Sequence, residues 1–269
     1  GQAPVAFTAP ASDGGSAITT YTVTSSPGGF TASGAASPLV VTGLANGTAY
    51  TFTVTATNAT GTSVASAASS AVTPKGTQTI AFGNPGTQTF GTAPTVTAAS
   101  SAGLPVSFTS ATTAVCTITS GGTLTFGSSG ACSIHADQSG DGTFQAASQV
   151  TQTFTVAAVV PGAPSVGTAT AGDTQATVSF TAPASTGGAA ISDYTVTAQP
   201  GGITATGAGS PITLTGLTNG IAYTFTVTAT NSAGTGGASA ASPAVTPPGA
   251  PGLPLPHPRG RKFRAPPAP

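Results

Sequence analysis

The sequence contains no tryptophan, no methionine and no glutamate, and only 4% of its 269 residues are charged. Carboxylate pairs supply the acid and base of many hydrolases, so this scarcity removes the usual machinery for that chemistry. The charges are also uneven: residues 1–256 hold five aspartates and one lysine, whereas the last thirteen residues hold three arginines and one lysine. The main part of the chain therefore offers no basic patch for nucleic acid and no acidic run for cations.

Long apolar runs and helical patterns are also missing. No stretch approaches the roughly 20 apolar residues of a membrane-spanning helix, and no amphipathic helical window of useful length is present. The sequence begins with neither a methionine nor a signal peptide, so we expect that these were removed or that the sequence is a fragment. In their place stand 37 glycines, 23 prolines and 52 threonines, a composition typical of short β-strands joined by turns.

The strongest feature present is an internal repeat. Residues 5–76 align with residues 178–249 at a constant offset of 173, and 51 of the 72 aligned positions are identical. A repeat of this length that carries a whole strand-rich pattern indicates a module copied in tandem. An enzyme rarely needs two near-identical copies of its core around a different domain, whereas a spacer, stalk or adhesin does.

Both copies carry the pattern of half-buried β-strands. In residues 50–58, YTFTVTATN, apolar residues alternate with threonine, and residues 223–231 repeat this alternation. A period of two marks a strand with one buried face. Residues 18–24 and 191–197 predict a second pair of strands, and pairs of Gly, Pro and Asn residues predict the turns between strands. Several short strands with regular turns indicate an antiparallel sandwich.

One segment of each copy resembles bacterial members of the fibronectin type III family. Residues 44–54, LANGTAYTFTV, and their copy, residues 217–227, look like the family's strand corner and the strand that follows it. The resemblance implies a tyrosine corner built from Leu44 and Tyr50, with Leu217 and Tyr223 as its second copy. In such a corner the phenol bonds back to the backbone and fixes the turn. Phe7 and Phe180 stand where the family usually has a core tryptophan.

Residues 77–158 form a different module. The segments 77–110 and 114–156 resemble the bacterial immunoglobulin-like repeats of large surface proteins, and we expect strands near 115–119, 123–127, 131–136 and 150–156. This resemblance implies a structural module without catalytic residues.

We therefore expect an all-β fold of tandem antiparallel β-sandwiches in an extended array, in the order fibronectin type III, immunoglobulin-like, fibronectin type III. The expected parts are module one (residues 1–76), module two (77–158), module three (159–248) and a disordered, proline-rich basic tail (249–269). The linkers between modules are short and contain proline, which stiffens them.

Module one lacks its expected first strand. In module three, residues 161–173 precede the aligned block and should form that strand, but in module one Gly1 already aligns with Thr174. Either a longer array was cut at this point, or module one has an open edge that accepts a strand from a neighbour.

Cys116 and Cys132 are the only cysteines. An even count in a β-protein expected outside the cell favours a disulfide over two buried thiols. A metal site is disfavoured because no further His or Cys residue is placed to complete it.

The segment DQSGDG resembles the first half of a calcium loop, with Asp137, Ser139 and Asp141 as candidate oxygen ligands. The flanking helices and the final bidentate glutamate of such loops are missing, so an Asx-rich turn is the alternative. His135 lies two residues before Asp137, but no nucleophile elbow accompanies them, and we interpret this histidine as a surface residue.

The tail departs from the rest of the chain. Residues 248–251, PGAP, repeat residues 161–164, yet a proline-rich basic segment follows instead of a further module. Such a segment could bind an anionic surface or a proline-recognising partner. It could equally be an end that is not native.

The sequence thus predicts a non-catalytic spacer region of a bacterial cell-surface or secreted repeat protein that acts in adhesion or domain presentation. It predicts no cofactor, no nucleic-acid partner and no membrane span. The expected partners are neighbouring modules of a longer chain and a cell-surface protein or polysaccharide. Two alternatives are accessory modules of a secreted polysaccharide-degrading enzyme, and an adhesin with its own binding site. The second alternative needs exposed aromatic residues, for which Tyr21, Phe30 and Tyr194 are the candidates.

Overall fold

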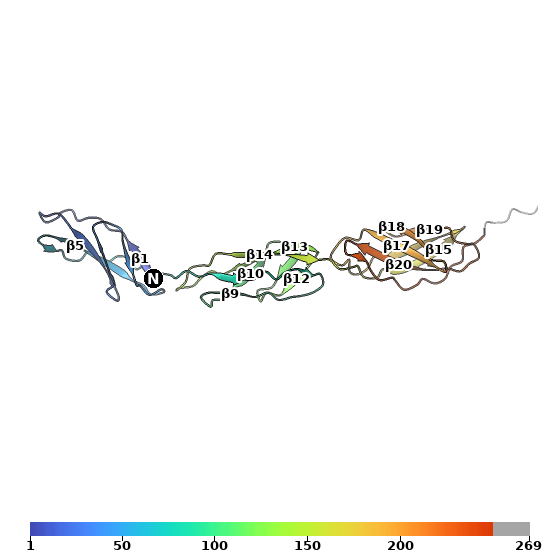
Figure 1. Cartoon of the computed structure of the whole chain (residues 1–269), viewed down its shortest axis with the longest axis horizontal. Helices are drawn as coiled ribbons and strands as arrows, with labels where there is room; N and C mark the ends of the chain where they lie inside the picture. The colour runs from blue at the N-terminus through green and yellow to red at the C-terminus, as the bar shows by residue number, and fades with distance from the viewer. Residues whose placement is uncertain (250–269) are drawn as a thin grey trace, which may run out of the picture. The chain divides into compact units, whose positions relative to one another are not determined.

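The structure is a computed structural model that describes residues 1–249. All the elements of secondary structure named in this range are β-strands (Figure 1). The expected all-β fold of antiparallel sandwiches is confirmed. The described residues divide into two compact units: the first contains residues 1–88 and 92–156, and the second contains residues 89–91 and 157–249.

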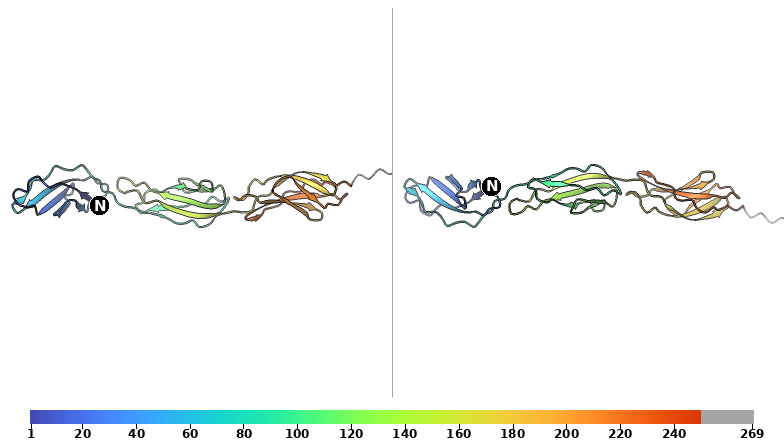
Figure 2. Two further views of the ribbon diagram at one scale, coloured as in Figure 1. Left: turned by 90° about the horizontal axis from the view of Figure 1, so that it is seen from above. Right: turned by 90° about the horizontal axis from the view of Figure 1, so that it is seen from below.

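Module three contains two antiparallel sheets, which Figure 2 shows from two further sides. One sheet has the strand order β15-β16-β19 and the other the order β18-β17-β20-β21. The strands are β15 Ser165–Gly172, β16 Gln175–Thr181, β17 Asp193–Gln199, β18 Ile203–Gly207, β19 Ile212–Thr215, β20 Thr224–Asn231 and β21 Gly234–Thr235.

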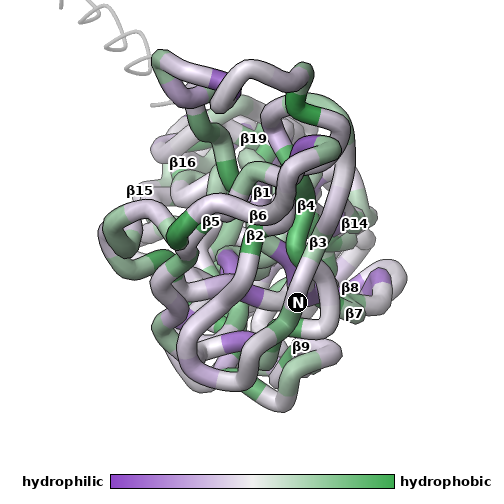
Figure 3. The backbone as a smooth tube through the Cα atoms, turned by 90° about the vertical axis from the view of Figure 1, so that its left-hand side faces the viewer, coloured by the Kyte–Doolittle hydropathy of each residue, from purple (hydrophilic) through white to green (hydrophobic). Residues whose placement is uncertain are grey.

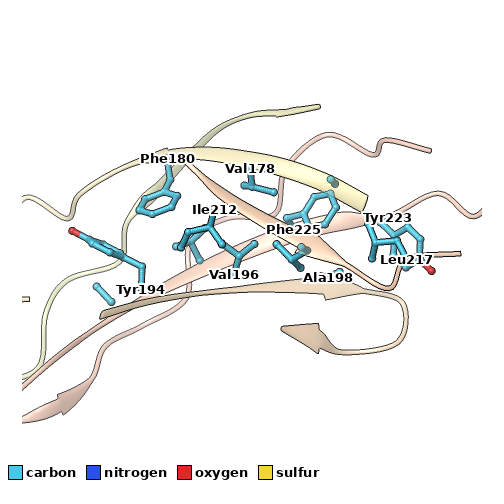
Figure 4. Close-up of a cluster of buried hydrophobic side chains, with 13 residues drawn as sticks. Val178, Phe180, Tyr194, Val196, Ala198, Ile212, Leu217, Tyr223 and Phe225 are labelled. Atoms are coloured by element: carbon cyan, nitrogen blue, oxygen red, sulfur yellow. The ribbon is translucent and has the colours of Figure 1, made fainter. Parts of the chain in front are cut away.

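Strict alternation along β20 explains how the two sheets enclose a core. Phe225, Val227 and Ala229 are fully buried, while the threonines between them stay partly exposed. Phe180 and Tyr194 close one end of this core with ring centroids 4.8 Å apart, and Leu217 and Tyr223 lie at the other end (Figure 4). Burial of each large apolar side chain contributes about 1.5–3 kcal/mol.

Module one repeats this arrangement with one strand fewer. Its sheets have the orders β1-β4 and β3-β2-β5-β6. Figure 3 shows β4 as a strongly apolar segment. Within residues 1–249, nothing pairs with β1 as β15 pairs with β16 in module three. The strands are β1 Gln2–Val5, β2 Thr20–Ser26, β3 Thr31–Gly34, β4 Leu39–Thr42, β5 Thr51–Asn58 and β6 Gly61–Thr62.

Module two is built from three small sheets, with the orders β10-β13-β14-β8, β11-β12 and β7-β9. Cys116 and Cys132 are both fully buried and form a disulfide that joins β11 to β13. The strands are β7 Ile80–Phe82, β8 Gln88–Thr89, β9 Ala98–Ser100, β10 Ser107–Ser110, β11 Cys116–Ile118, β12 Leu124–Phe126, β13 Gly130–Asp137 and β14 Val150–Ala157.

The segment between modules one and two is held by its own contacts. Gly76 N donates a hydrogen bond to Thr143 O at 2.8 Å, and Gln145 N donates to Gly76 O at 2.8 Å. Lys75 Nζ donates to Asp141 O at 2.5 Å. These bonds hold residues 75–76 against the loop of residues 141–145 in module two.

Candidate binding groove

Each repeated module has a tyrosine that bonds back to its own corner. Tyr50 Oη accepts a hydrogen bond from Ala45 N at 3.0 Å, and Tyr223 Oη accepts one from Thr218 N at 3.1 Å. Both rings are buried, with exposed fractions of 3% and 4%. These bonds fix the corner before β5 and β20 and so set the position of the central strand in each module.

The segment after β5 is hydrogen-bonded to β5 through a row of three evenly spaced serines. Ser63, Ser66 and Ser69 each accept a hydrogen bond on Oγ from a β5 N–H group at 3.0 Å, and each donates its own N–H to the carbonyl of the same β5 residue at 2.8–2.9 Å. The spacing of three residues is that of polyproline II and not of a β-strand. Module three has the same arrangement at Ser239 and Ser242, but Gly236 replaces the first serine.

A groove of about 870 Å³ lies beside this row in module one. Its apolar lining includes Phe7, Ile18, Tyr21, Val54 and Ala56. The rings of Phe7 and Tyr21 lie 4.9 Å apart at a tilt of 51°. Around them the groove is lined by polar residues, namely Thr8, Ser12, Asp13, Thr55, Asn58, Thr60, Thr62, Ser63 and Ser66.

The groove exists because module one leaves uncovered what module three covers. Val227 and Ala229 are fully buried in module three, whereas the matching Val54 and Ala56 are only half-buried. Likewise Phe180 is buried and Phe7 is half-buried. The sequence alone indicated a missing strand but not the size or lining of the resulting groove.

The serine row gives a paired test of this difference in burial. Ser239→Ala removes the acceptor for Val227 N, and because Ser239 is buried, that N–H is left without a partner. We expect the free energy of unfolding of module three to fall by about 1–3 kcal/mol. The matched Ser66→Ala should destabilise module one less, since Ser66 is exposed and water can replace its Oγ. Denaturation of both variants, followed separately for each module, measures the two losses in free energy of unfolding. Equal losses in module one and module three would contradict the prediction.

The residues of the calcium-like loop already serve the loop itself. Asp141 Oδ1 accepts hydrogen bonds from the N–H groups of Phe144 and Thr143, both at 2.8 Å, and these bonds hold the pKa of Asp141 below its ordinary value. The turn is therefore stabilised at neutral pH and loses this support as the pH falls through the lowered pKa. Asp137, at the end of β13, accepts a hydrogen bond from Gln149 Nε2 at 2.8 Å. Ser139 follows in the same loop and is exposed.

Three further features bear on chemistry. His135 bonds to Thr151 Oγ1 through Nδ1 at 2.8 Å on the partly exposed face of β13. Among residues 1–249, no group of three or more His, Cys, Asp or Glu residues could hold a metal ion. Over the same range, no helix has the length and apolar character needed to cross a membrane. The tail expected to be disordered lies outside the described residues, apart from its first residue, Gly249.

Of the aromatic residues considered for ligand binding, Tyr21 and Tyr194 are core residues with exposed fractions of 9% and 7%. Phe30 is 36% exposed, and its ring packs edge-on against Tyr50 at a centroid distance of 6.1 Å. The aromatic lining of the groove thus consists of the half-buried Phe7 and the buried Tyr21, which pack against each other.

The fold and its tyrosine corners define a tandem β-sandwich protein. Residues 2–72 and 161–245 match the fibronectin type III domain, and together they make up more than half of the sequence. The chain belongs to the fibronectin type III family. No curated protein matches the sequence.

Several solved structures are similar. Domains A168-A170 from titin are 19% identical, with coverage of 87% of this chain and 84% of theirs and a TM-score of 0.33. The FN1-FN3 domains of chicken CNTN1 are 17% identical, with coverage of 88% and 91% and a TM-score of 0.28. The twitchin kinase region from C. elegans is 25% identical over 33% of this chain, with a TM-score of 0.31. This chain spans less than a fifth of the twitchin structure and of a titin kinase structure.

Proposed function

We propose that this chain is a non-catalytic spacer region of a bacterial cell-surface or secreted protein, which holds other domains apart or presents them to a partner. The observation that carries the proposal is the tandem of β-sandwiches, two of them fibronectin type III modules, joined by short linkers. Tandem modules of this family are typically non-catalytic. Module two, which lies outside the two matched regions, serves in this proposal as an immunoglobulin-like spacer between them.

The buried disulfide supports a location outside the cell. Disulfides form and persist in oxidising compartments and are rare in the cytosol. The bond between Cys116 and Cys132 is therefore consistent with a secreted or surface-exposed chain. The low charge of the body, with five aspartates and one lysine before the tail, gives no basis for binding nucleic acid.

Small-angle X-ray scattering tests the spacer role. A compact globule of about 250 residues has a radius of gyration of about 18 Å. A spacer must keep its modules apart, so we expect the measured radius to be at least about half as large again as the compact value. A variant with (Gly-Ser)₅ inserted after Lys75 serves as the control for linker stiffness and should give a broader distribution of distances. A radius near the compact value for the unmodified chain would contradict the proposal.

A further inference from the structure

The strand β20 of module three has an outer side that faces away from β17. Within residues 1–249, the only strand paired with this side is β21, whose two residues pair with Thr230 and Asn231. Along the rest of β20 the backbone groups of alternate residues point outward. Such an edge is a template on which a strand of another molecule can pair, and natural proteins close or disturb their edges for this reason.

The serine row occupies the outward groups of β20. Val227 N donates to Ser239 Oγ at 2.9 Å, and Ser239 N donates back to Val227 O at 2.9 Å. Phe225 N donates to Ser242 Oγ at 3.0 Å, and Ser242 N donates to Phe225 O at 2.9 Å. Both serines are buried. Each serine therefore satisfies the donor and the acceptor of one strand residue, as a paired strand would.

The segment that carries the row does not become a strand itself. The two serines lie three residues apart in the sequence, whereas the two β20 residues that they bind lie two apart. Three segment residues thus span the length of two strand residues, and the segment cannot follow an extended β path. The serine hydroxyls also donate to the carbonyl groups of Ala240 and Pro243, both at 2.8 Å, and Pro243 has no N–H to offer. The outer side of the segment therefore lacks the regular N–H and C=O groups that a further strand needs.

Module one closes the same edge of β5 in the same way, through Ser66 and Ser69. The residues between the serines differ between the two modules, since Val64 of module one corresponds to Gly237 of module three. The arrangement therefore depends on the spacing of the serines and not on the side chains between them.

We infer that the serine row blocks edge-to-edge strand pairing between modules. Modules that share most of their sequence present matching edges, which exposes them to mispairing with each other and with a second copy of the chain. Serine side chains close the edges of β5 and β20 and leave no new strand edge outside them. This inference goes beyond the spacer role, because it assigns to the row the task of keeping similar modules separate.

The test is the double variant Ser239→Ala and Ser242→Ala in the full chain, measured by analytical ultracentrifugation over a range of protein concentrations. The loss of both hydroxyls leaves two N–H groups of β20 without their acceptors, so pairing with β20 of a second copy restores two hydrogen bonds. We expect the dissociation constant of the dimer to fall at least about tenfold below that of the unmodified chain. The amide protons of Phe225 and Val227 should exchange more slowly as the dimer forms.

Val178→Ala is the control for a loss of stability alone. Val178 is fully buried and belongs to β16, in the other sheet of module three. Its truncation destabilises the core but leaves the serine row intact. This variant should stay monomeric at the concentrations at which the double variant forms dimers.

A second variant keeps both serines and changes their spacing. Deletion of Ala238, Ala241 and Ala244, combined with Pro243→Ser, places the serines two residues apart. The segment can then pair with β20 as a regular strand, which leaves a free edge on its outer side. We expect this variant to form dimers as well.

The matched pair Ser66→Ala and Ser69→Ala repeats the test in module one, where both serines are exposed and water can replace their hydroxyls during folding. Dimerisation of Val178→Ala equal to that of the row variants would show that association follows from instability, and the inference would be wrong. It would be equally wrong if the folded row variants stayed monomeric at all concentrations measured, or if the unmodified chain dimerised through β20 as strongly as they do.

Discussion

Replacing both cysteines with alanine should lower the free energy of unfolding of module two by about 3 kcal/mol. The disulfide joins Cys116 and Cys132 across a sequence separation of 16 residues. In the chain-entropy description, closing a loop of about this size in the unfolded state is worth about 3 kcal/mol. Module two depends on this bond because its strands other than β13 and β14 have only two to four residues, and two of its three sheets have only two strands.

The measurement must separate the modules, since a chain of several modules does not unfold in a single two-state step. Module two contains no tyrosine, whereas modules one and three each contain two, so tyrosine signals report only on its neighbours. Amide exchange at buried module-two residues such as Leu124 and Ile134 reports on module two itself. Faster exchange there, with unchanged exchange at Val196 in module three, is the expected result. Unchanged exchange at Leu124 in the double variant would contradict the prediction.

The sequence predicted the strands best where alternation is strict. The segment at residues 223–231 alternates over its whole length, and β20 has the same burial pattern. The matching strand β5 alternates equally well in sequence, yet Val54 and Ala56 are only half-buried. Alternation shows which face a side chain takes, but burial depends on what covers that face, and the cover comes from another segment of the chain.

Strand boundaries and the serine row were harder to predict. Residues 18–24 were expected as a strand, but β2 runs over Thr20–Ser26. Threonine and serine suit both strands and turns, so local composition does not set this limit. The row at Ser63, Ser66 and Ser69 has a period of three, which neither the strand period nor the helix period detects. Its signal in the sequence is the spacing S-x-x-S-x-x-S directly after a strand.

The prediction of the phenol hydrogen bonds at Tyr50 and Tyr223 rested on a different kind of inference. Resemblance to a family supplied this geometry, because the residue spacing alone does not reveal which backbone group a phenol reaches. The groove lining is the opposite case. Its apolar residues are those of an ordinary core, and they line a groove because no strand covers them within residues 1–249.

Module one should unfold before module three, although the two share most of their sequence. The strand β15 contributes eight residues to module three and buries Val227 and Ala229 completely, while the matching residues of module one remain half-exposed. Complete burial of one large apolar side chain is worth about 1.5–3 kcal/mol, and at least Val5, Phe7 and Val54 lack part of this burial. We therefore expect the stability of module one to be lower by about 3 kcal/mol or more.

Limited proteolysis of the full chain checks this order directly. The first cuts should fall within residues 1–76, and residues 161–248 should survive as a fragment, because cleavage of a transiently open module follows its opening free energy. Differences in cleavable residues matter little here, since 51 of 72 aligned positions are identical. A nonspecific protease such as proteinase K therefore meets similar sites in both modules. Adding a synthetic peptide of residues 162–173, which contains most of β15, should delay the cuts in module one and leave those in module three unchanged, and this result would connect the instability to the missing edge strand. Equal protease resistance of the two modules without peptide would mean that some other contact stabilises module one. The absence of a strand equivalent to β15 would then not lower its stability.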